Sequence, residues 1–456
     1  MFKRILVANR GEIAVRIIRC CREMGVESVA VYSTADSTSL HTQLATKAVC
    51  VGGPKAADSY LDMKNIISAA IMTHCDAIHP GFGFLSENSE FARLCDSYGI
   101  EFIGPCAEVI DRMGNKAAAR ALMIENKVPI VPGSKSSVET SKEALRICEE
   151  IGYPILIKAA AGGGGRGMRK VFDASEVEAQ FEAARSEAIA CFGDSEMYIE
   201  KLIINPRHIE FQILADQFGN IVHLGERECS IQRKSQKLIE EAPSKGLTKE
   251  LRNEMGKAAV NAAKAANYTN AGTVEFILDA QGQYYFIEMN TRIQVEHPVT
   301  EMVTGIDLIK QQICIAAGLK LGVKQKDICV SGHAIECRIN AEDPKNDFLP
   351  CSGRIDFLHF PGGNDVRVDS AIYNGYELSP FYDSMVAKII VHAPTRLEAI
   401  RKMRRSLEEL VVEGIATSAD LAHQILYHRE FIKGTYNTGF IESYLDDILN
   451  WEASKE

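Results

Sequence analysis

The sequence contains no apolar run long enough to cross a membrane. Its 456 residues are 46% hydrophobic, which is enough to bury two or three cores. No stretch reaches the about 18 consecutive apolar residues that a spanning helix needs. Residues 1–7 enter a predicted strand directly and lack the apolar region and cleavage site of a signal peptide. These absences predict a cytoplasmic protein with no membrane partner.

The chain also lacks metal-binding or disulfide-exchange cysteine spacings. None of its 13 cysteines forms a Cys-x-x-Cys pair, and most lie in apolar stretches, as Cys20 and Cys21 do. Reduced thiols in buried cores are therefore expected rather than disulfides or zinc ligands. A net charge of −10 argues against nucleic acid as a partner. It does not bear on small anions, whose binding depends on local lysines and arginines.

The most informative stretch that is present runs from Tyr284 to His297, where a hydrophobic strand enters a cluster of charged and amide side chains. If the extended conformation persists, side chains two apart share a face. One face then carries Glu288, Asn290, Arg292, Gln294 and Glu296. The other carries Ile287, Met289, Ile293 and Val295.

A second predicted strand, residues 273–278, precedes the first through a turn-rich segment. A four-residue loop at 280–283 would place Glu275 opposite Glu288. Two carboxylates directly across a ladder repel each other unless a cation lies between them. Mg²⁺ in the company of a nucleotide suits this position, and Asn290 would supply a third oxygen.

Two solvated glutamates on a half-exposed sheet are the alternative, and strand alternation alone favours it. Arg292 and Glu296 on the same side tip the balance toward a reaction site, because they add an anion clamp and a base.

A glycine-rich segment, residues 159–167, indicates a nucleotide independently. It follows a predicted strand that ends in Lys158 and precedes another predicted strand, 168–172. Glycine lets backbone N–H groups close on phosphates, although a flexible turn is the alternative reading. The segment matches neither a Walker A loop nor a dinucleotide fingerprint. We expect a hairpin tip that folds over a triphosphate, with Lys116 and Lys158 supplying phosphate charges.

Several long motifs, in order, resemble the ATP-grasp superfamily and within it the biotin carboxylase family. They lie at residues 8–14, 79–88, 162–167, 288–301 and 336–344. The resemblance covers essentially the whole chain.

The predicted fold is mixed α/β and α+β. Alternating strands and helices predict a Rossmann-like parallel sheet over residues 1–112, which we expect to act as scaffold and dimer former because two of three fingerprint glycines are missing. An ATP-grasp domain is predicted over 113–330, with a flap at about 131–203. A C-terminal α+β cap follows over 331–446, and residues 447–456 form a tail.

The resemblance implies roles for individual residues. The ATP contacts would be Lys116, Lys158, Gly164, Gly165, Glu200, Lys201, Leu202, Ile203, His208, Ser235, Glu275 and Glu288. Two Mg²⁺ or Mn²⁺ ions would be held by Glu275, Glu288 and Asn290. The bicarbonate site matches Lys237, Arg292, Gln294, Val295 and Glu296. Arg338 matches the residue beside the biotin ureido group, and it would be catalytic together with Glu296, Arg292 and Lys237. The family usually has histidine where this chain has Ser235.

The implied reaction is ATP-dependent carboxylation of biotin on a separate carrier. Glu296 would deprotonate bicarbonate, whose oxygen attacks the γ-phosphorus to give carboxyphosphate. Arg338 would then stabilise the biotin enolate that captures CO₂.

The resemblance also implies partners: a biotin carboxyl carrier protein, carboxyltransferase subunits and a second copy of the chain. No lysine here lies between two methionines as a biotin acceptor does, so the chain should carry no biotin itself. The first choice of assembly is acetyl-CoA carboxylase in fatty acid synthesis.

Other readings stay open at this stage. A pyruvate or propionyl-CoA carboxylase uses similar modules, and another ATP-grasp ligase would share the flap and metal hairpin. A non-catalytic nucleotide-binding subunit would tolerate loss of Arg292 or Glu296, and both are present.

Overall fold

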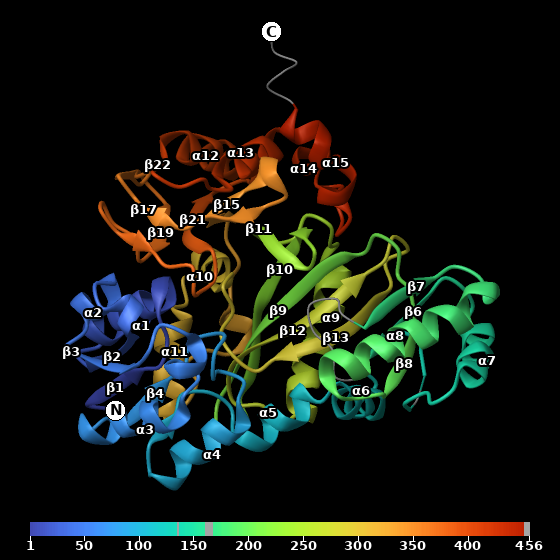
Figure 1. The fold of residues 1–456 in the computed structure, drawn as a ribbon, viewed down its shortest axis with the longest axis horizontal. Helices are drawn as coiled ribbons and strands as arrows, with labels where there is room; N and C mark the ends of the chain where they lie inside the picture. The colour runs from blue at the N-terminus through green and yellow to red at the C-terminus, as the bar shows by residue number, and fades with distance from the viewer. Residues whose placement is uncertain (135, 160–166, 451–456) are drawn as a thin grey trace.

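The N-terminal region is built on a parallel sheet. The computed structural model describes residues 1–134, 136–159 and 167–450 (Figure 1). Five strands lie in the order β3-β2-β1-β4-β5, and all neighbours are parallel. They are β1 (Arg4–Val7), β2 (Glu27–Ser33), β3 (Lys47–Gly52), β4 (Ala77–His79) and β5 (Glu101–Phe102). The predicted Rossmann-like sheet is confirmed.

Five helices accompany this sheet: α1 (Gly11–Glu23), α2 (Leu40–Leu44), α3 (Met63–Met72), α4 (Ser89–Ser97) and α5 (Ala107–Gly114). In α1, Ile13, Ile17 and Cys21 are buried and recur every four residues, which gives the helix one apolar stripe. The same core includes residues of α11 (Leu308–Ala316), so the N-terminal sheet packs onto the central region.

An eight-stranded antiparallel sheet forms the middle of the molecule, in the order β13-β12-β9-β10-β11-β14-β21-β19. Its strands are β9 (Arg207–Ala215), β10 (Ile221–Arg233), β11 (Gln236–Ala242), β12 (Asn270–Leu278), β13 (Tyr284–Asn290), β14 (His333–Asn340), β19 (Val366–Ser370) and β21 (Met385–Ala393). Helices α6 (Lys116–Glu125), α9 (Lys249–Ala265) and α10 (His297–Thr304) belong to this region. The sheet runs across the expected division at 330/331, because β11 pairs with β14.

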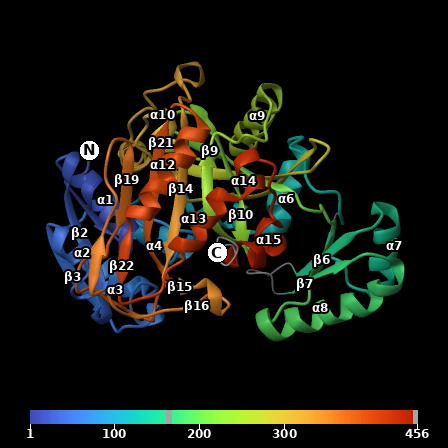
Figure 2. The same ribbon diagram turned by 90° about the horizontal axis from the view of Figure 1, so that it is seen from above.

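A small α+β unit stands to one side of this sheet (Figure 2). It contains the antiparallel strands β7-β6-β8, which are β6 (Ile155–Ala159), β7 (Met168–Val171) and β8 (Met197–Lys201), with α7 (Ser141–Ile151) and α8 (Val177–Phe192). These elements share a core of their own. The two strands predicted around the glycine-rich segment are present, while Gly164 and Gly165 lie outside the described residues.

The C-terminal region completes the end of the large sheet and adds short strands and helices. The strands are β15 (Glu342–Asp343), β16 (Leu349–Pro350), β17 (Gly353–Arg354), β18 (Phe357–His359), β20 (Glu377–Leu378) and β22 (Val411–Glu413). The helices are α12 (Arg396–Glu409), α13 (Ala419–Tyr427), α14 (Arg429–Lys433) and α15 (Phe440–Leu449). Helix α12 begins with a capping box between Thr395 and Glu398.

Within the described ranges, no helix combines the length and apolar character that crossing a membrane requires.

Candidate active site

A cleft of about 1330 Å³ opens where the three regions meet. Its walls include Phe82 and Phe84 from the N-terminal region, Lys116 and Lys158 from the central region, and Arg338 from the C-terminal region. It also contains most of the charged residues that follow β13. Residues from every part of the sequence therefore contribute to one site.

The hairpin of β12 and β13 pairs Glu275 with Glu288, as predicted, but by a different route. Next to the turn, Leu278 pairs with Tyr284, which is one residue out of the predicted register. A bulge at Ile287 then restores the pairing, since Phe276 faces Phe286 and Glu275 faces Glu288. A bulge of this kind re-aims side chains beside a site. Here it turns Glu288 toward the cleft.

The predicted division of side chains between two faces is wrong at two positions. Ile287 is 41% exposed and lines the cleft together with Glu288, because it is the extra residue of the bulge. Val295 also lines the cleft, because β13 ends at Asn290 and the chain then turns into α10. Met289 and Ile293 are buried in hydrophobic cores.

Glu275 is surrounded by donors. Asn290 Nδ2 and Gln294 Nε2 each lie 2.8 Å from its Oε1, and His208 Nε2 lies 3.1 Å from its Oε2. Burial would raise the pKa of Glu275, but Lys237 and His208 lower it well below the usual value. Burial would likewise lower the pKa of His208, and Glu275 raises it to about 9.

The residues around Glu275 fit a divalent cation. Burial and the facing carboxylate of Glu275 raise the pKa of Glu288, and a cation between the two would remove that repulsion. His208, Glu210 and Glu275 also have ligand atoms within 4.8 Å of one another. Asn290, the third predicted ligand, is buried beside Glu275, with its oxygen 3.1 Å from Arg292 NH2.

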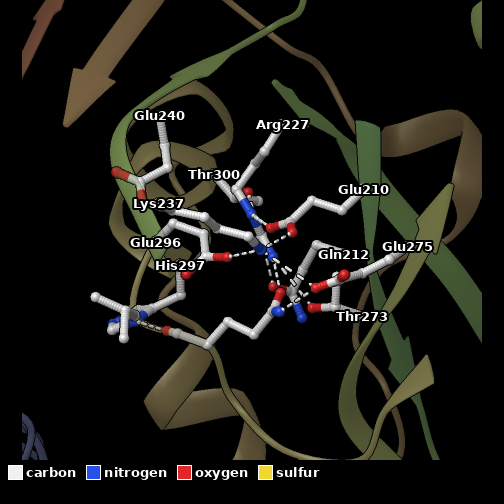
Figure 3. A network of polar contacts seen from close by, with 12 residues as sticks. Glu210, Gln212, Arg227, Lys237, Glu240, Thr273, Glu275, Glu296, His297 and Thr300 are labelled. Atoms are coloured by element: carbon white, nitrogen blue, oxygen red, sulfur yellow. Dashed lines mark hydrogen bonds and ion pairs between the residues drawn. The ribbon is translucent and has the colours of Figure 1, made fainter. Parts of the chain in front are cut away.

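Lys237 is the central cation of the site. Its Nζ lies 2.6 Å from Glu210 Oε2, 2.6 Å from Glu296 Oε1 and 3.2 Å from Glu275 Oε1 (Figure 3). Burial would lower the pKa of Lys237, but these three carboxylates raise it well above the usual value. The lysine is therefore charged, and it joins the predicted metal residues to the predicted base.

Glu296 is held ionised between two cations. Its Oε1 accepts a hydrogen bond from Lys237, and its Oε2 accepts one from Arg338 NH2 at 3.0 Å. Burial and Glu210 would raise the pKa of Glu296, but Lys237 and Arg338 keep it below its usual value. An ionised carboxylate is the form that a general base requires.

Arg292 is placed differently from the expectation that it holds Glu296. Its Nε donates to Glu87 Oε2 at 2.8 Å, and the backbone N–H of Thr291 donates to Glu87 Oε1 at 3.0 Å. Glu87 belongs to the N-terminal motif 79–88, where no role was predicted for it. The contact joins that motif to the segment after β13, 205 residues away in sequence.

The predicted ATP contacts fall into two groups. Lys116, Lys158, Leu202, Ile203, His208 and Ser235 line the cleft. Glu200 and Lys201 do not line it: Glu200 pairs with Lys158 at 2.6 Å, and Lys201 Nζ donates to the carbonyls of Gly152 and Tyr153. Ser235 lies at the tip of the β10–β11 hairpin, in a left-handed conformation with φ of 66°.

Sequence reasoning missed three buried partners of the predicted residues. Glu210 accepts from Lys237, Arg227 donates to Gln294, and Glu240 accepts from Arg338 Nε at 2.6 Å. All three are fully buried or nearly so and come from strands β9, β10 and β11. Each lies on a hydrophobic strand without a local motif, so only the pairing of those strands identifies it.

A small antiparallel flap facing a larger antiparallel sheet, across a cleft that gathers lysines and carboxylates, is the architecture expected of an ATP-grasp enzyme. Three family models match the chain. "Biotin carboxylase, N-terminal domain" matches residues 1–110, "Carbamoyl-phosphate synthase L chain, ATP binding domain" matches 115–324, and "Biotin carboxylase C-terminal domain" matches 336–443. The protein belongs to the biotin carboxylase family and is an ATP-dependent ligase.

Individual relatives agree over their whole lengths. The chain is 55% identical to the biotin carboxylase of Nostoc sp., covering 97% of this chain and 99% of that one. It is 51% identical to a pyruvate carboxylase subunit of Methanothermobacter thermautotrophicus, covering 97% and 90%. A solved structure of the biotin carboxylase domain dimer of Hydrogenobacter thermophilus 2-oxoglutarate carboxylase, in complex with MgADP, ADP and bicarbonate, is 50% identical. It has a TM-score of 0.94 and covers 98% and 99%.

Proposed function

We propose that this chain carboxylates biotin with bicarbonate at the expense of ATP, through carboxyphosphate. The observation that carries the proposal is Glu296, a buried ionised carboxylate held by Lys237 and Arg338 in the cleft beside Glu275. The Hydrogenobacter structure that contains MgADP and bicarbonate on the same fold supports this reading.

The bicarbonate step falls to the residues after β13. Lys237, Arg292 and Gln294 present N–H donors that suit a small oxyanion, and the backbone of Val295 lies beside them. Glu296 takes the bicarbonate proton on a carboxylate oxygen, which frees the bicarbonate oxygen to attack the γ-phosphorus. Lys237 and Arg338 release part of their attraction for Glu296 at that moment and can turn to the substrate.

The nucleotide step falls to Lys116, Lys158 and the hairpin of β12 and β13. Bound between Glu275, Glu288 and Asn290, Mg²⁺ or Mn²⁺ would neutralise phosphate charge, with two ions expected from the family. The lysines bind phosphate oxygens, and Leu202 and Ile203 offer an apolar wall. Gly164 and Gly165 are proposed to close over the phosphates. Ser235, Glu200 and Lys201 stay predictions as ATP contacts.

The carboxyl-transfer step falls to Arg338. Glu240 fixes its Nε, so that its remaining N–H groups face Glu296 and the cleft. A guanidinium there stabilises an enolate on the biotin ureido oxygen, which then captures CO₂ released from carboxyphosphate.

The proposed setting is a cytoplasmic homodimer that works with a biotin carboxyl carrier protein and carboxyltransferase subunits. Acetyl-CoA carboxylase, supplying malonyl-CoA for fatty acids, is the first choice because the Nostoc relative is named simply a biotin carboxylase. A pyruvate carboxylase is the alternative, because the Methanothermobacter relative is nearly as similar. The domain limits at 112, 330 and 446 likewise remain proposals.

Hydrolysis of ATP by the purified chain tests the function. The release of ADP should depend on bicarbonate and rise when free biotin is added, and it should rise further with a biotinylated carrier, since tethering raises the local concentration. The chain itself should be blank on an avidin blot. ATP hydrolysis that ignores bicarbonate and biotin but responds to ammonia or another amine would contradict the proposal and favour a different ATP-grasp ligase.

A further inference from the structure

Arg227 on β10 is the most completely bonded cation of the site. Its side chain is 0% exposed, and it does not line the cleft. All five of its N–H groups have an acceptor. Nε donates to Glu210 Oε1 at 2.5 Å, NH1 donates to Gln212 and Thr300 at 2.7 and 3.0 Å, and NH2 donates to Thr273 and Gln294 at 3.1 and 2.8 Å (Figure 3).

The bond to Gln294 fixes which end of that amide faces the cleft. A guanidinium can only donate, so Gln294 must direct its Oε1 to Arg227. Its NH₂ group then points the other way, where it donates to Glu275 Oε1 at 2.8 Å. The second N–H of that group is left for an anion. With the amide turned over, a carbonyl oxygen would face both Glu275 and the anion and would repel them.

The bond to Glu210 has a parallel effect on Lys237. Arg227 occupies Oε1 of Glu210, so that Oε2 faces Lys237 Nζ at 2.6 Å. Lys237 is thereby held within reach of Glu296 as well. One buried arginine thus determines the orientation of two groups that face the cleft.

We propose that Arg227 is a positioning residue for bicarbonate: its planar fork sets the amide of Gln294 donor-side toward the anion and holds Glu210 against Lys237. The inference rests on the proposed function, since it assumes that bicarbonate binds beside Gln294. Lysine could not substitute, because it has three donors on one nitrogen and no plane.

The test separates bicarbonate from ATP. Arg227→Lys should raise the KM for bicarbonate by roughly 10- to 100-fold, the size expected for misplacing charged hydrogen bonds, while the KM for ATP changes by less than about threefold. In a Gln294→Ala background the same substitution should add little, because its effect runs through the missing amide. Full additivity in the double variant, or an unchanged bicarbonate KM in Arg227→Lys, would overturn the proposal.

Two buried threonines give matched controls should Arg227→Lys fail to fold. Thr273→Val and Thr300→Val each remove one acceptor of Arg227, and both side chains are buried. Only Thr273 shares the NH2 nitrogen with Gln294. Thr273→Val should therefore raise the bicarbonate KM more than Thr300→Val at a similar loss of thermal stability, and equal effects would count against the proposal. Failure of the proposed function is distinguishable, because the wild-type chain would then lack bicarbonate-dependent ATP hydrolysis.

Discussion

Single residues in this site act through the charges beside them. Glu275, Glu288 and Glu296 are all carboxylates in one cleft, yet their surroundings differ. Cations lower the pKa of Glu275 and Glu296, whereas burial and a facing carboxylate raise the pKa of Glu288. Environment rather than residue type therefore assigns ligand and base.

Replacing Glu288 with glutamine should abolish ATP cleavage without unfolding the protein. The substitution removes one charge of the proposed metal site, and we expect a loss on the order of 100-fold or more in kcat, or roughly 3 kcal/mol. Because the pKa of Glu288 is already raised by burial, a neutral amide there should leave the melting temperature nearly unchanged. Near-normal turnover at ordinary Mg²⁺ would refute the metal assignment.

Replacing Arg338 with alanine should uncouple the two half-steps. Arg338 is proposed to act after carboxyphosphate forms, so biotin carboxylation should fall at least about tenfold more than bicarbonate-dependent ATP hydrolysis. Arg338→Lys keeps a positive charge beside Glu240 and Glu296 and serves as the control for lost ion pairs. Equal losses of both activities in Arg338→Ala would contradict this placement.

At the scale of elements, hairpins determine what reaches the cleft. The bulge at Ile287 turns Glu288 inward, and the two-residue turn between β10 and β11 carries Ser235 to the cleft wall. Both turn residues, Lys234 and Ser235, have positive φ, which is the pattern of a type I′ turn. The strand ends, not the strand centres, thus hold the position where the family has histidine.

Replacing Ser235 with histidine should tighten ATP binding modestly. Histidine tolerates the left-handed conformation better than most residues, and its ring reaches further than a hydroxyl. The gain should match one hydrogen bond, about 0.5 to 1.5 kcal/mol in the Kd measured by calorimetry. Ser235→Ala serves as the control without a polar group. An unchanged Kd in the histidine variant would mean that another residue already makes the contact.

At the scale of the whole molecule, buried ion pairs tie the regions together behind the site. Lys388 on β21 is 0% exposed; it donates to the carbonyl of Val295 at 2.8 Å and pairs with Glu12 of α1 at 3.1 Å. One lysine of the C-terminal region therefore contacts both the N-terminal region and the segment that carries Glu296. The large sheet reinforces the connection, because it runs without interruption from β13 to β19.

A second buried cluster should make stability depend on pH. Glu241 of β11 accepts hydrogen bonds from Arg396 and His333. Burial would raise the pKa of Glu241, but Arg396 and His333 lower it to about 2, against about 4.3 for an unfolded chain. A depressed pKa contributes stability that is complete above pH 5 and is lost as the pH falls toward 2, here roughly 3 kcal/mol.

Glu241→Gln should therefore be less stable than wild type at pH 7, and its stability should change less between pH 6 and pH 3. Urea unfolding at several pH values measures this. Parallel curves for the two proteins would show that Glu241 does not carry the pH dependence.

The sequence by itself determined the elements and the local pairings. Alternation over 273–290 predicted that Glu275 faces Glu288, and spacing predicted the parallel N-terminal sheet and the strands around the glycine-rich segment, because these features depend on neighbours along the chain. The face assignments of Ile287 and Val295 failed, because a bulge and a strand end are set by packing. The charge partners were decided only by the tertiary structure. Glu87 meets Arg292 across 205 residues, Glu240 meets Arg338 across 98, and Arg227 meets Gln294 across 67. No local pattern encodes such contacts, since they exist only once separate strands and domains have packed against one another and excluded water from the charges between them.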